Sequence, residues 1–209
     1  MMEDTQSFYA RYVQDFTAAL QAIEADQSAA RCSVAEGLHQ VRTWLKQVQA
    51  DQRKMMIIGN GGSAGVASHM ATDFVKNGHI RCLAFNDGAL LTCLSNDYSY
   101  EEAFQAAVDR FGDPGDLLIA ISSSGSSQNI RNAAQLARDR SMTVVTCSGF
   151  DTDNPLRQMG HVNFYVPSHS YGFVETLHQL IIHAMLDVKL QCDDGLDVFH
   201  KNQPLNRPA

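Results

Sequence analysis

The sequence predicts an α/β fold, a flavodoxin-like, doubly wound parallel sheet of five strands preceded by a pair of helices. Short apolar runs alternate with segments whose apolar residues recur every three or four positions, as strands alternate with amphipathic helices. A glycine-rich turn follows the first apolar run, and a serine-rich turn follows the third. Both turns lead into helices, so we expect them at the carboxyl ends of the strands, where open parallel sheets bind ligands.

The bulk properties of the chain narrow its class. Its 209 residues suffice for one domain with its own core, and its net charge of −7 argues against a surface that coats nucleic acid. The five cysteines form no CxxC pair and three lie in apolar runs, which is typical of reduced thiols and predicts a cytoplasmic protein. We find neither a signal peptide nor an apolar run of about 18 residues, so no membrane contact is expected.

Two amphipathic helices are predicted ahead of the first strand, over residues 4–25 and 33–49. They have no sheet of their own to cover. They could pack on the main domain or bury their apolar stripes against another subunit in a helical bundle, and we favour the second arrangement. Residues 1–50 are therefore assigned to oligomerisation, residues 51–192 to the ligand-binding domain and residues 193–209 to a C-terminal tail.

The remaining elements alternate along the chain. Strands are expected at 55–58, 80–85, 117–121, 142–147 and 162–166. Helices are expected at 64–77, 89–94, 101–111, 128–139 and 171–190, with a further short helix beginning at Asn154-Pro155. Asn96-Asp97-Tyr98 is expected to interrupt the chain between the second and third of these helices.

The two turns have the chemistry of an anion site. Gly59-Asn60-Gly61-Gly62-Ser63 can bring free backbone N–H groups and a helix N-terminus close to a ligand. Alone, this turn also fits a relaxed dinucleotide fingerprint, although a ribose-binding acid is missing where one is expected. Ser122-Ser123-Ser124-Gly125-Ser126-Ser127 adds five hydroxyls at the start of a second helix. Hydroxyl and N–H donors without a fixed positive charge suit a phosphate monoester that must be held and released.

Together the two turns resemble those of the sugar isomerase (SIS) domain family, and residues 5–190 are similar to its bacterial phosphoheptose isomerases. The resemblance implies an isomerase that converts sedoheptulose 7-phosphate to D-glycero-D-manno-heptose 7-phosphate through an enediol, for lipopolysaccharide or capsule heptose. It implies a homotetramer with sites at subunit interfaces. It places phosphate contacts at Ser63, Ser122, Ser124 and Ser127, and further substrate contacts at Asn60, Gly61, Gly62, Asp73, Asn96, Asp97, Ser123 and Glu175.

Four side chains on two helices are candidates for metal binding. His69 and Asp73 share a helix face one turn apart, and Glu175 and His183 lie on the final helix. Two histidines and two carboxylates suit a divalent ion such as zinc, and the resemblance places ligands and catalytic groups at these positions. The family set is His, Glu, Gln and His, so Asp73 is one methylene shorter and Glu175 adds a charge. Gly172 stands where the family has an aspartate.

An enediol reaction needs a base at the carbon-bound proton and an acid at the oxygens. Our hypothesis makes His183 the base, Asp73 its acid partner and the metal an oxygen polariser. Alternatives stay open: a non-catalytic SIS protein that binds phosphosugars in regulation, or an isomerase for a different phosphosugar. Ser127 could instead be a helix N-cap, Asp97 a turn residue, and His178 is expected to be a core or surface residue.

Overall fold

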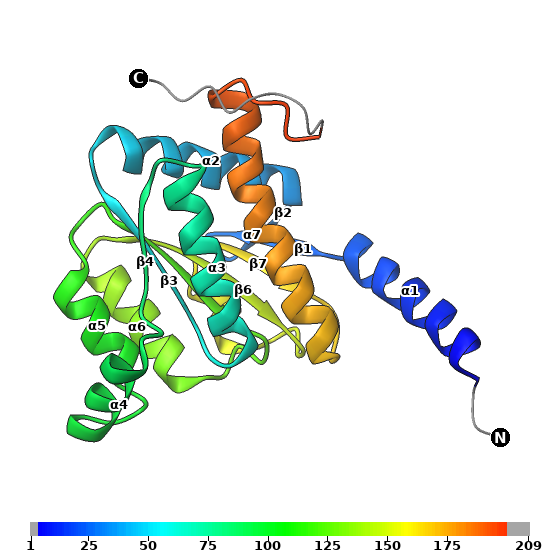
Figure 1. Cartoon of the computed structure of the whole chain (residues 1–209), viewed down its shortest axis with the longest axis horizontal. Helices are drawn as coiled ribbons and strands as arrows, with labels where there is room; N and C mark the ends of the chain where they lie inside the picture. The colour runs from blue at the N-terminus through cyan, green and yellow to red at the C-terminus, as the bar shows by residue number, and fades with distance from the viewer. Residues whose placement is uncertain (1–3, 200–209) are drawn as a thin grey trace.

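The computed structural model describes residues 4–199 and contains one seven-stranded sheet with the order β2-β1-β7-β6-β5-β3-β4 (Figure 1). The strands are β1 (Glu24–Gln27), β2 (Ala30–Cys32), β3 (Lys54–Gly59), β4 (Arg81–Ala84), β5 (Leu117–Ser122), β6 (Thr143–Gly149) and β7 (Val162–Val166). The five strands from β3 to β7 pair in parallel, as the sequence predicts. The strands β1 and β2 extend the sheet as an antiparallel hairpin beside β7.

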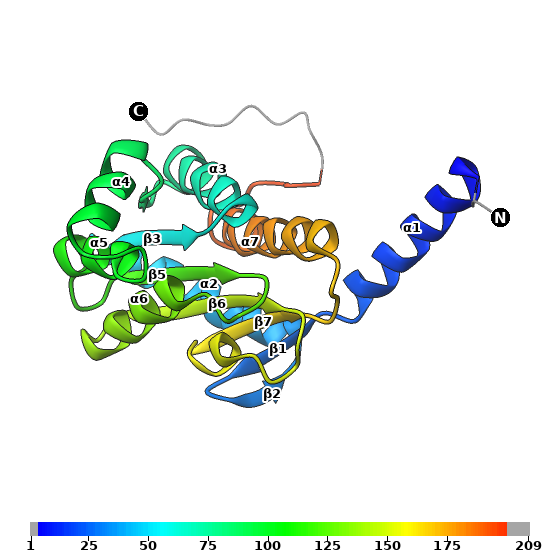
Figure 2. The ribbon, with the colours of Figure 1, turned by 90° about the horizontal axis from the view of Figure 1, so that it is seen from below.

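Helices cover both faces of the sheet. They are α1 (Thr5–Gln21), α2 (Val34–Ala50), α3 (Gly62–Lys76), α4 (Gly88–Asp97), α5 (Ala103–Phe111), α6 (Gln128–Asp139) and α7 (Tyr171–Asp193), with the 3₁₀ turn η1 (Pro155–Gln158). Figure 2 shows α3 and α7 on one side of the sheet and α6 on the other. Along β3, Met55 and Ile57 pack with α2, α3 and α7, while Met56 and Ile58 pack with α5 and α6. This two-sided burial explains why the strand reads as a continuous apolar run.

The hairpin corrects the prediction of one helix over residues 4–25, because α1 ends at Gln21 and β1 starts at Glu24. Its two turn residues, Ser28 and Ala29, have φ values of 49° and 64°. Two-residue hairpin turns of this kind favour glycine or asparagine, so Ser-Ala gives no turn signal. The hairpin is instead stabilised by a partner distant in sequence, since Arg157 of η1 pairs with carboxylates of β1.

The two N-terminal helices differ in their packing. Val41, Leu45 and Val48 of α2 are buried in the chain's own core, so the expectation that both apolar stripes face another subunit is wrong for α2. In contrast, α1 extends away from the body of the protein (Figures 1 and 2), and Phe8 and Tyr9 on it are exposed. The oligomerisation role of residues 1–50 stays a prediction. No helix between residues 4 and 199 is both long and apolar enough to cross a membrane.

Candidate active site

The glycine loop between β3 and α3 needs its glycines. Gly61 has a φ of 55°, a left-handed value that glycine adopts without strain. A Cβ at Gly59 would lie 2.7 Å from the backbone carbonyl carbon of Ser63, too close for any side chain. Gly61 is also the N-cap of α3 and has no side chain that could bond the first N–H groups of the helix. These groups and the helix dipole therefore offer an anion site.

A pocket of about 210 Å³ brings the glycine loop and the serine loop together at the carboxyl ends of β3 and β5. It is lined by Asn60, Gly61, Gly62, Ser63, Ile121, Ser122, Ser123, Ser124, Ser127, Tyr171 and Glu175. This volume lies below the range of about 300–1,000 Å³ that is usual for drug-sized ligands. The pocket therefore suits a small phosphorylated ligand better than a dinucleotide. Tyr171 is a lining residue that the sequence did not indicate.

The serine loop turns sharply before α6. Gly125 has a φ of 63°, and a Cβ there would lie 2.7 Å from Cβ of Asn154. Ser122 donates its hydroxyl to Ser127 Oγ at 3.2 Å, which joins the two ends of the loop. Ser127 occupies the N-cap position of α6 but its side chain makes no capping hydrogen bond. Ser127 therefore lies at the position of a helix cap, as the alternative interpretation predicts. Its hydroxyl, however, does not cap the helix and accepts a hydrogen bond from Ser122 instead.

Asn60 is held by two residues that sequence reasoning missed. Tyr100 donates its hydroxyl to Asn60 Oδ1 at 2.8 Å. The Asn60 and Asn129 amides also exchange hydrogen bonds, with N–O distances of 2.9 and 3.0 Å. Asn60 Oδ1 thus accepts two hydrogen bonds from protein groups, and one hydrogen of Asn60 Nδ2 is donated to Asn129. The second hydrogen of Nδ2 remains available for a ligand. Asn129 is buried one residue into α6, and because this burial appears only in the folded chain, no sequence pattern indicated it.

Two predicted substrate contacts lie elsewhere. Asn96 and Asp97 are exposed in the last turn of α4, so they do not interrupt this helix as expected, and they are not among the residues that line the pocket. Asn96 Nδ2 donates to Asp97 Oδ1 at 3.0 Å. Cys93 lies 3.5 Å from the other Asp97 oxygen, and this carboxylate raises the pKa of the Cys93 thiol. A contact between these residues and substrate stays a prediction.

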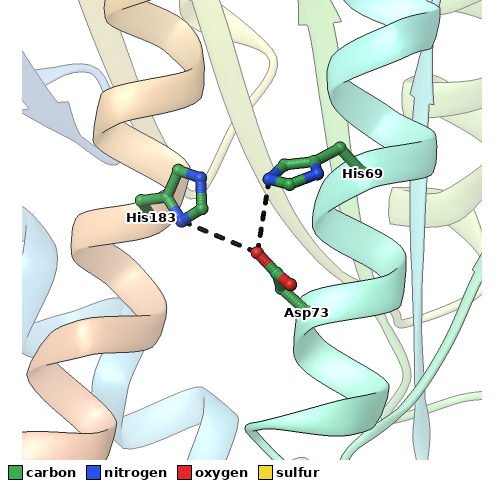
Figure 3. Close-up of side chains that lie close together, drawn as sticks. All are labelled: His69, Asp73 and His183. Atoms are coloured by element: carbon green, nitrogen blue, oxygen red, sulfur yellow. Dashed lines mark ion pairs between the residues drawn. The ribbon is translucent and has the colours of Figure 1, made fainter. Parts of the chain in front are cut away.

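A second group of polar side chains, the His69–Asp73–His183 cluster, lies where α3 and α7 run side by side (Figure 3). Asp73 Oδ2 is 3.3 Å from His69 Nε2 and 3.9 Å from His183 Nδ1. One donor atom from each residue lies within 4.8 Å of the others. Donors bound to a tetrahedral zinc at 2.0–2.1 Å are about 3.3 Å apart, so small adjustments would bring all three onto one ion. Three ligands with an open side are typical of catalytic zinc sites.

Glu175, the fourth predicted ligand, is not part of this cluster. Its carboxylate lies against Gly62, where a Cβ would come within 2.5 Å of Glu175 Cδ, and it lines the pocket instead. Glu175 and His183 are eight residues apart on α7, which corresponds to a separation of about 12 Å along the helix axis. Three of the four predicted ligands are thus brought together, and the fourth lines the pocket between the glycine loop and the serine loop.

Two further ionisable side chains of α7 complete this region. His178 is fully buried, as expected of a core residue; Nε2 lies 3.0 Å from the Ser148 carbonyl oxygen. Burial lowers the pKa of His178 to about 4. Asp187 lies one turn beyond His183; burial raises the pKa of its carboxyl, while His183 acts to lower it. The i, i+4 spacing from His183 was the sequence signal for Asp187, which sequence reasoning missed.

Comparisons with known proteins agree with this geometry. The family model "SIS domain" matches residues 11–149. Phosphoheptose isomerase of Shewanella denitrificans is 34% identical over 163 residues, which cover 74% of this chain and 83% of that protein. The solved structure of phosphoheptose isomerase GmhA from Neisseria gonorrhoeae superimposes with a TM-score of 0.77 at 28% identity, covering 89% of this chain and 99% of that one. The phosphoheptose isomerase structure from Francisella tularensis, at 23% identity and a TM-score of 0.75, shares the fold.

Proposed function

The chain belongs to the SIS domain family and is a phosphosugar isomerase, and from this membership we propose that it interconverts sedoheptulose 7-phosphate and D-glycero-D-manno-heptose 7-phosphate. The observation that carries the proposal is the pocket shared by the glycine loop and the serine loop. Relatives named phosphoheptose isomerase support a seven-carbon substrate.

The phosphate site is built from neutral donors. Ser63, Ser122, Ser124 and Ser127 offer hydroxyls, and the N-terminus of α3 adds backbone N–H groups. No lysine or arginine is among the residues that line the pocket. Such a site attracts a dianion through dipoles and hydrogen bonds, and it releases the product more readily than a site with a buried cation would.

We assign the His69–Asp73–His183 cluster to a divalent metal, with zinc as the best match to two imidazoles and a carboxylate. A bound ion of this kind supplies polarisation of a substrate oxygen. The sequence assigned His183 and Asp73 to proton transfer as well as to the metal. The single lone pair of His183 Nδ1 cannot serve both purposes at once, and the convergence of this nitrogen with Asp73 Oδ2 supports the metal role.

Conversion of sedoheptulose 7-phosphate, followed by NMR on chelated enzyme with and without added zinc, tests the activity. Ser124→Ala removes one hydroxyl from the pocket, whereas Ser126→Ala changes an exposed neighbour in the same loop. We expect Ser124→Ala to raise KM by about 10-fold or more, since hydrogen bonds to charged groups contribute about 1.5–3 kcal/mol. Ser126→Ala should match the wild type.

Other outcomes would select the alternatives. Turnover of another phosphosugar but not of the heptose would make the chain an isomerase of different specificity. Tight phosphosugar binding without turnover of any, at full zinc occupancy, would make it a binding or regulatory member of the family. Equal KM values for Ser124→Ala and Ser126→Ala would contradict the proposed phosphate site.

A homotetramer with sites at subunit interfaces is also part of the proposal, as are a cytoplasmic location and a role in heptose supply. The exposed aromatic residues of α1 support the assembly, because Phe8 and Tyr9 point away from the chain's own core. Tyr9→Glu should lower the mass measured by light scattering, whereas the exposed control Gln14→Glu should not. An unchanged tetramer in Tyr9→Glu would remove α1 from the interface.

A further inference from the structure

We infer that Asn129 is a positioning residue of the phosphate site, an inference that rests on the site described under the proposed function. Asn129 caps α6 in place of Ser127 and thereby leaves the Ser127 hydroxyl free for the ligand. Asn129 itself is buried and is not among the residues that line the pocket. It acts through Ser127 and Asn60, which both line the pocket.

Ser127 has the residue type and the place of a helix cap. The side chain of such a residue normally accepts a hydrogen bond from the backbone N–H two or three residues further along the chain. Ser33 before α2 and Ser170 before α7 both make this bond. Ser127 does not, and its Oγ lies 3.2 Å from Ser122 Oγ instead. Ser127 would therefore have to rotate its side chain to cap α6.

Asn129 takes the N–H that Ser127 leaves. Asn129 Oδ1 accepts the backbone N–H of Ile130 at 2.9 Å, and Ile130 is the third residue after Ser127, a position that an N-cap side chain serves. This N–H is one of the four at the start of a helix that have no partner within the helix. Because Asn129 satisfies it, α6 does not need the Ser127 hydroxyl. That hydroxyl accepts from Ser122, and its own hydrogen is left for a phosphate oxygen.

The same bond determines the orientation of the Asn60 amide. A backbone N–H can only donate, so the atom of Asn129 that faces the N–H of Ile130 is the oxygen. The nitrogen of the Asn129 amide lies 3.0 Å from Asn60 Oδ1 and donates to it, as Tyr100 also does. Asn60 Oδ1 is thus occupied, and Asn60 Nδ2 keeps one hydrogen for a ligand. Through Asn129, both loops of the pocket offer hydrogen-bond donors, which suit the oxygens of a phosphosugar.

Double-variant cycles test this role, because the task of Ser127 should change when Asn129 is lost. Asn129→Ala leaves the N–H of Ile130 without an acceptor, so Ser127 should rotate to cap it. Asn129→Asp keeps an acceptor there and should leave Ser127 in place. Ser127→Ala would be made in the wild type and in both backgrounds, with Gln135→Ala, which removes an exposed amide from the same helix, as the control. Calorimetry would measure the Kd of inorganic phosphate, and urea titration would measure the midpoint of unfolding.

Each effect of Ser127→Ala is compared with its own background, since the charge added by Asn129→Asp itself repels phosphate. In the wild-type and Asn129→Asp backgrounds, Ser127→Ala should raise the phosphate Kd by about 10-fold or more, as expected for one hydrogen bond to a charged group, and leave the midpoint nearly unchanged. In the Asn129→Ala background the two effects should exchange, so that Ser127→Ala changes the Kd by less than about 2-fold and lowers the midpoint through loss of a cap. Gln135→Ala should match the wild type in both measurements.

An equal effect of Ser127→Ala on the Kd in all three backgrounds would overturn the positioning role of Asn129. If Asn129→Ala does not fold, Asn129→Leu, which has a similar size and no acceptor, replaces it. Failure of both to fold would show that Asn129 supports the fold and not the site. Turnover of sedoheptulose 7-phosphate is measured separately. A wild type that binds phosphate and shows the exchange without turnover of any phosphosugar would overturn the proposed isomerase and support the role of Asn129, whereas an active wild type without the exchange would do the reverse.

Discussion

Gly62→Ala tests how closely the glycine loop and Glu175 depend on each other. Gly62 is the first residue of α3 and has no positive φ, so the backbone accepts alanine. The new Cβ would lie 2.5 Å from Glu175 Cδ and 2.6 Å from Oε1. Because non-bonded carbons prefer about 3.5–4.0 Å, the carboxylate must retreat by about 1 Å or more.

Gly62→Ala should lower the rate of catalysis and leave the stability of the fold nearly unchanged. Alanine gains up to about 1 kcal/mol over glycine in a helix, and a displaced Glu175 rotamer costs about as much. The free energy of unfolding should therefore change by less than about 1 kcal/mol. A displacement of about 1 Å at a group that positions the substrate can cost about 100-fold in rate. Because Glu175 lines the pocket, we expect kcat to fall by about that factor.

Gly65→Ala is the matched control, since it lies on the same helix and a Cβ there meets no atom within 4 Å. Urea titration and NMR turnover would be measured for both variants and for Gly62→Ala combined with Glu175→Gln. The double variant should be no slower than Glu175→Gln alone. Wild-type kcat in Gly62→Ala would refute this reasoning. A loss of more than about 2 kcal/mol of stability would show that the backbone, and not Glu175, gives way.

Three further predictions concern stability and the metal. Arg157→Leu should lower the free energy of unfolding in urea by about 2 kcal/mol, because its two carboxylate partners on β1 lose a buried cation and keep only the exposed Arg31. The exposed control Arg110→Leu should change it by less than about 0.5 kcal/mol. The pKa of His178 is about 4 in the folded state and 6.5 in the unfolded state, so the unfolded state binds a proton first as the pH falls. The free energy of unfolding should therefore be full above pH 6.5 and fall by about 3 kcal/mol toward pH 4. His178→Gln should abolish that loss. Asp73→Asn should reduce zinc content at least 10-fold by elemental analysis, and unchanged content would contradict the cluster as the site.

Much of the sheet could be predicted because its signals are local. The helix at 128–139 and the strand at 162–166 match α6 and β7 residue for residue, since strong periodicity and clear turns flank them. The β1–β2 hairpin could not, because Ser28-Ala29 is no turn signal and Arg157, which anchors the hairpin, comes 131 residues after Asp26. Ion pairs between residues distant in sequence stabilise the hairpin, and local sequence patterns do not reveal such pairs.

The site divides in the same way. The glycine and serine loops are contiguous motifs, and the structure brings them into one pocket. Tyr100 and Asn129 reach Asn60 from 40 and 69 residues away, so no spacing rule indicates them. For Glu175 and His183 the helical period gives the angle between the side chains. The period alone does not show that Glu175 is too far along α7 to join the metal cluster. The packing of α7 against α3 places Glu175 beside the glycine loop and His183 beside His69 and Asp73.

The β1–β2 hairpin also determines which strand ends the sheet. All five residues of β7 are buried, and a bare β7 edge would present unpaired backbone groups beside Phe164 and Tyr165, a template for edge-to-edge aggregation. β1 covers that edge, and the strand left outermost is β2, which spans only Ala30–Cys32 and carries the charged Arg31. A short, charged terminal strand is a poor partner for a second sheet. The hairpin thus protects the protein from aggregation through the edge of its sheet. A chain trimmed to begin after residue 32 would be expected to precipitate during expression even though its parallel strands are intact.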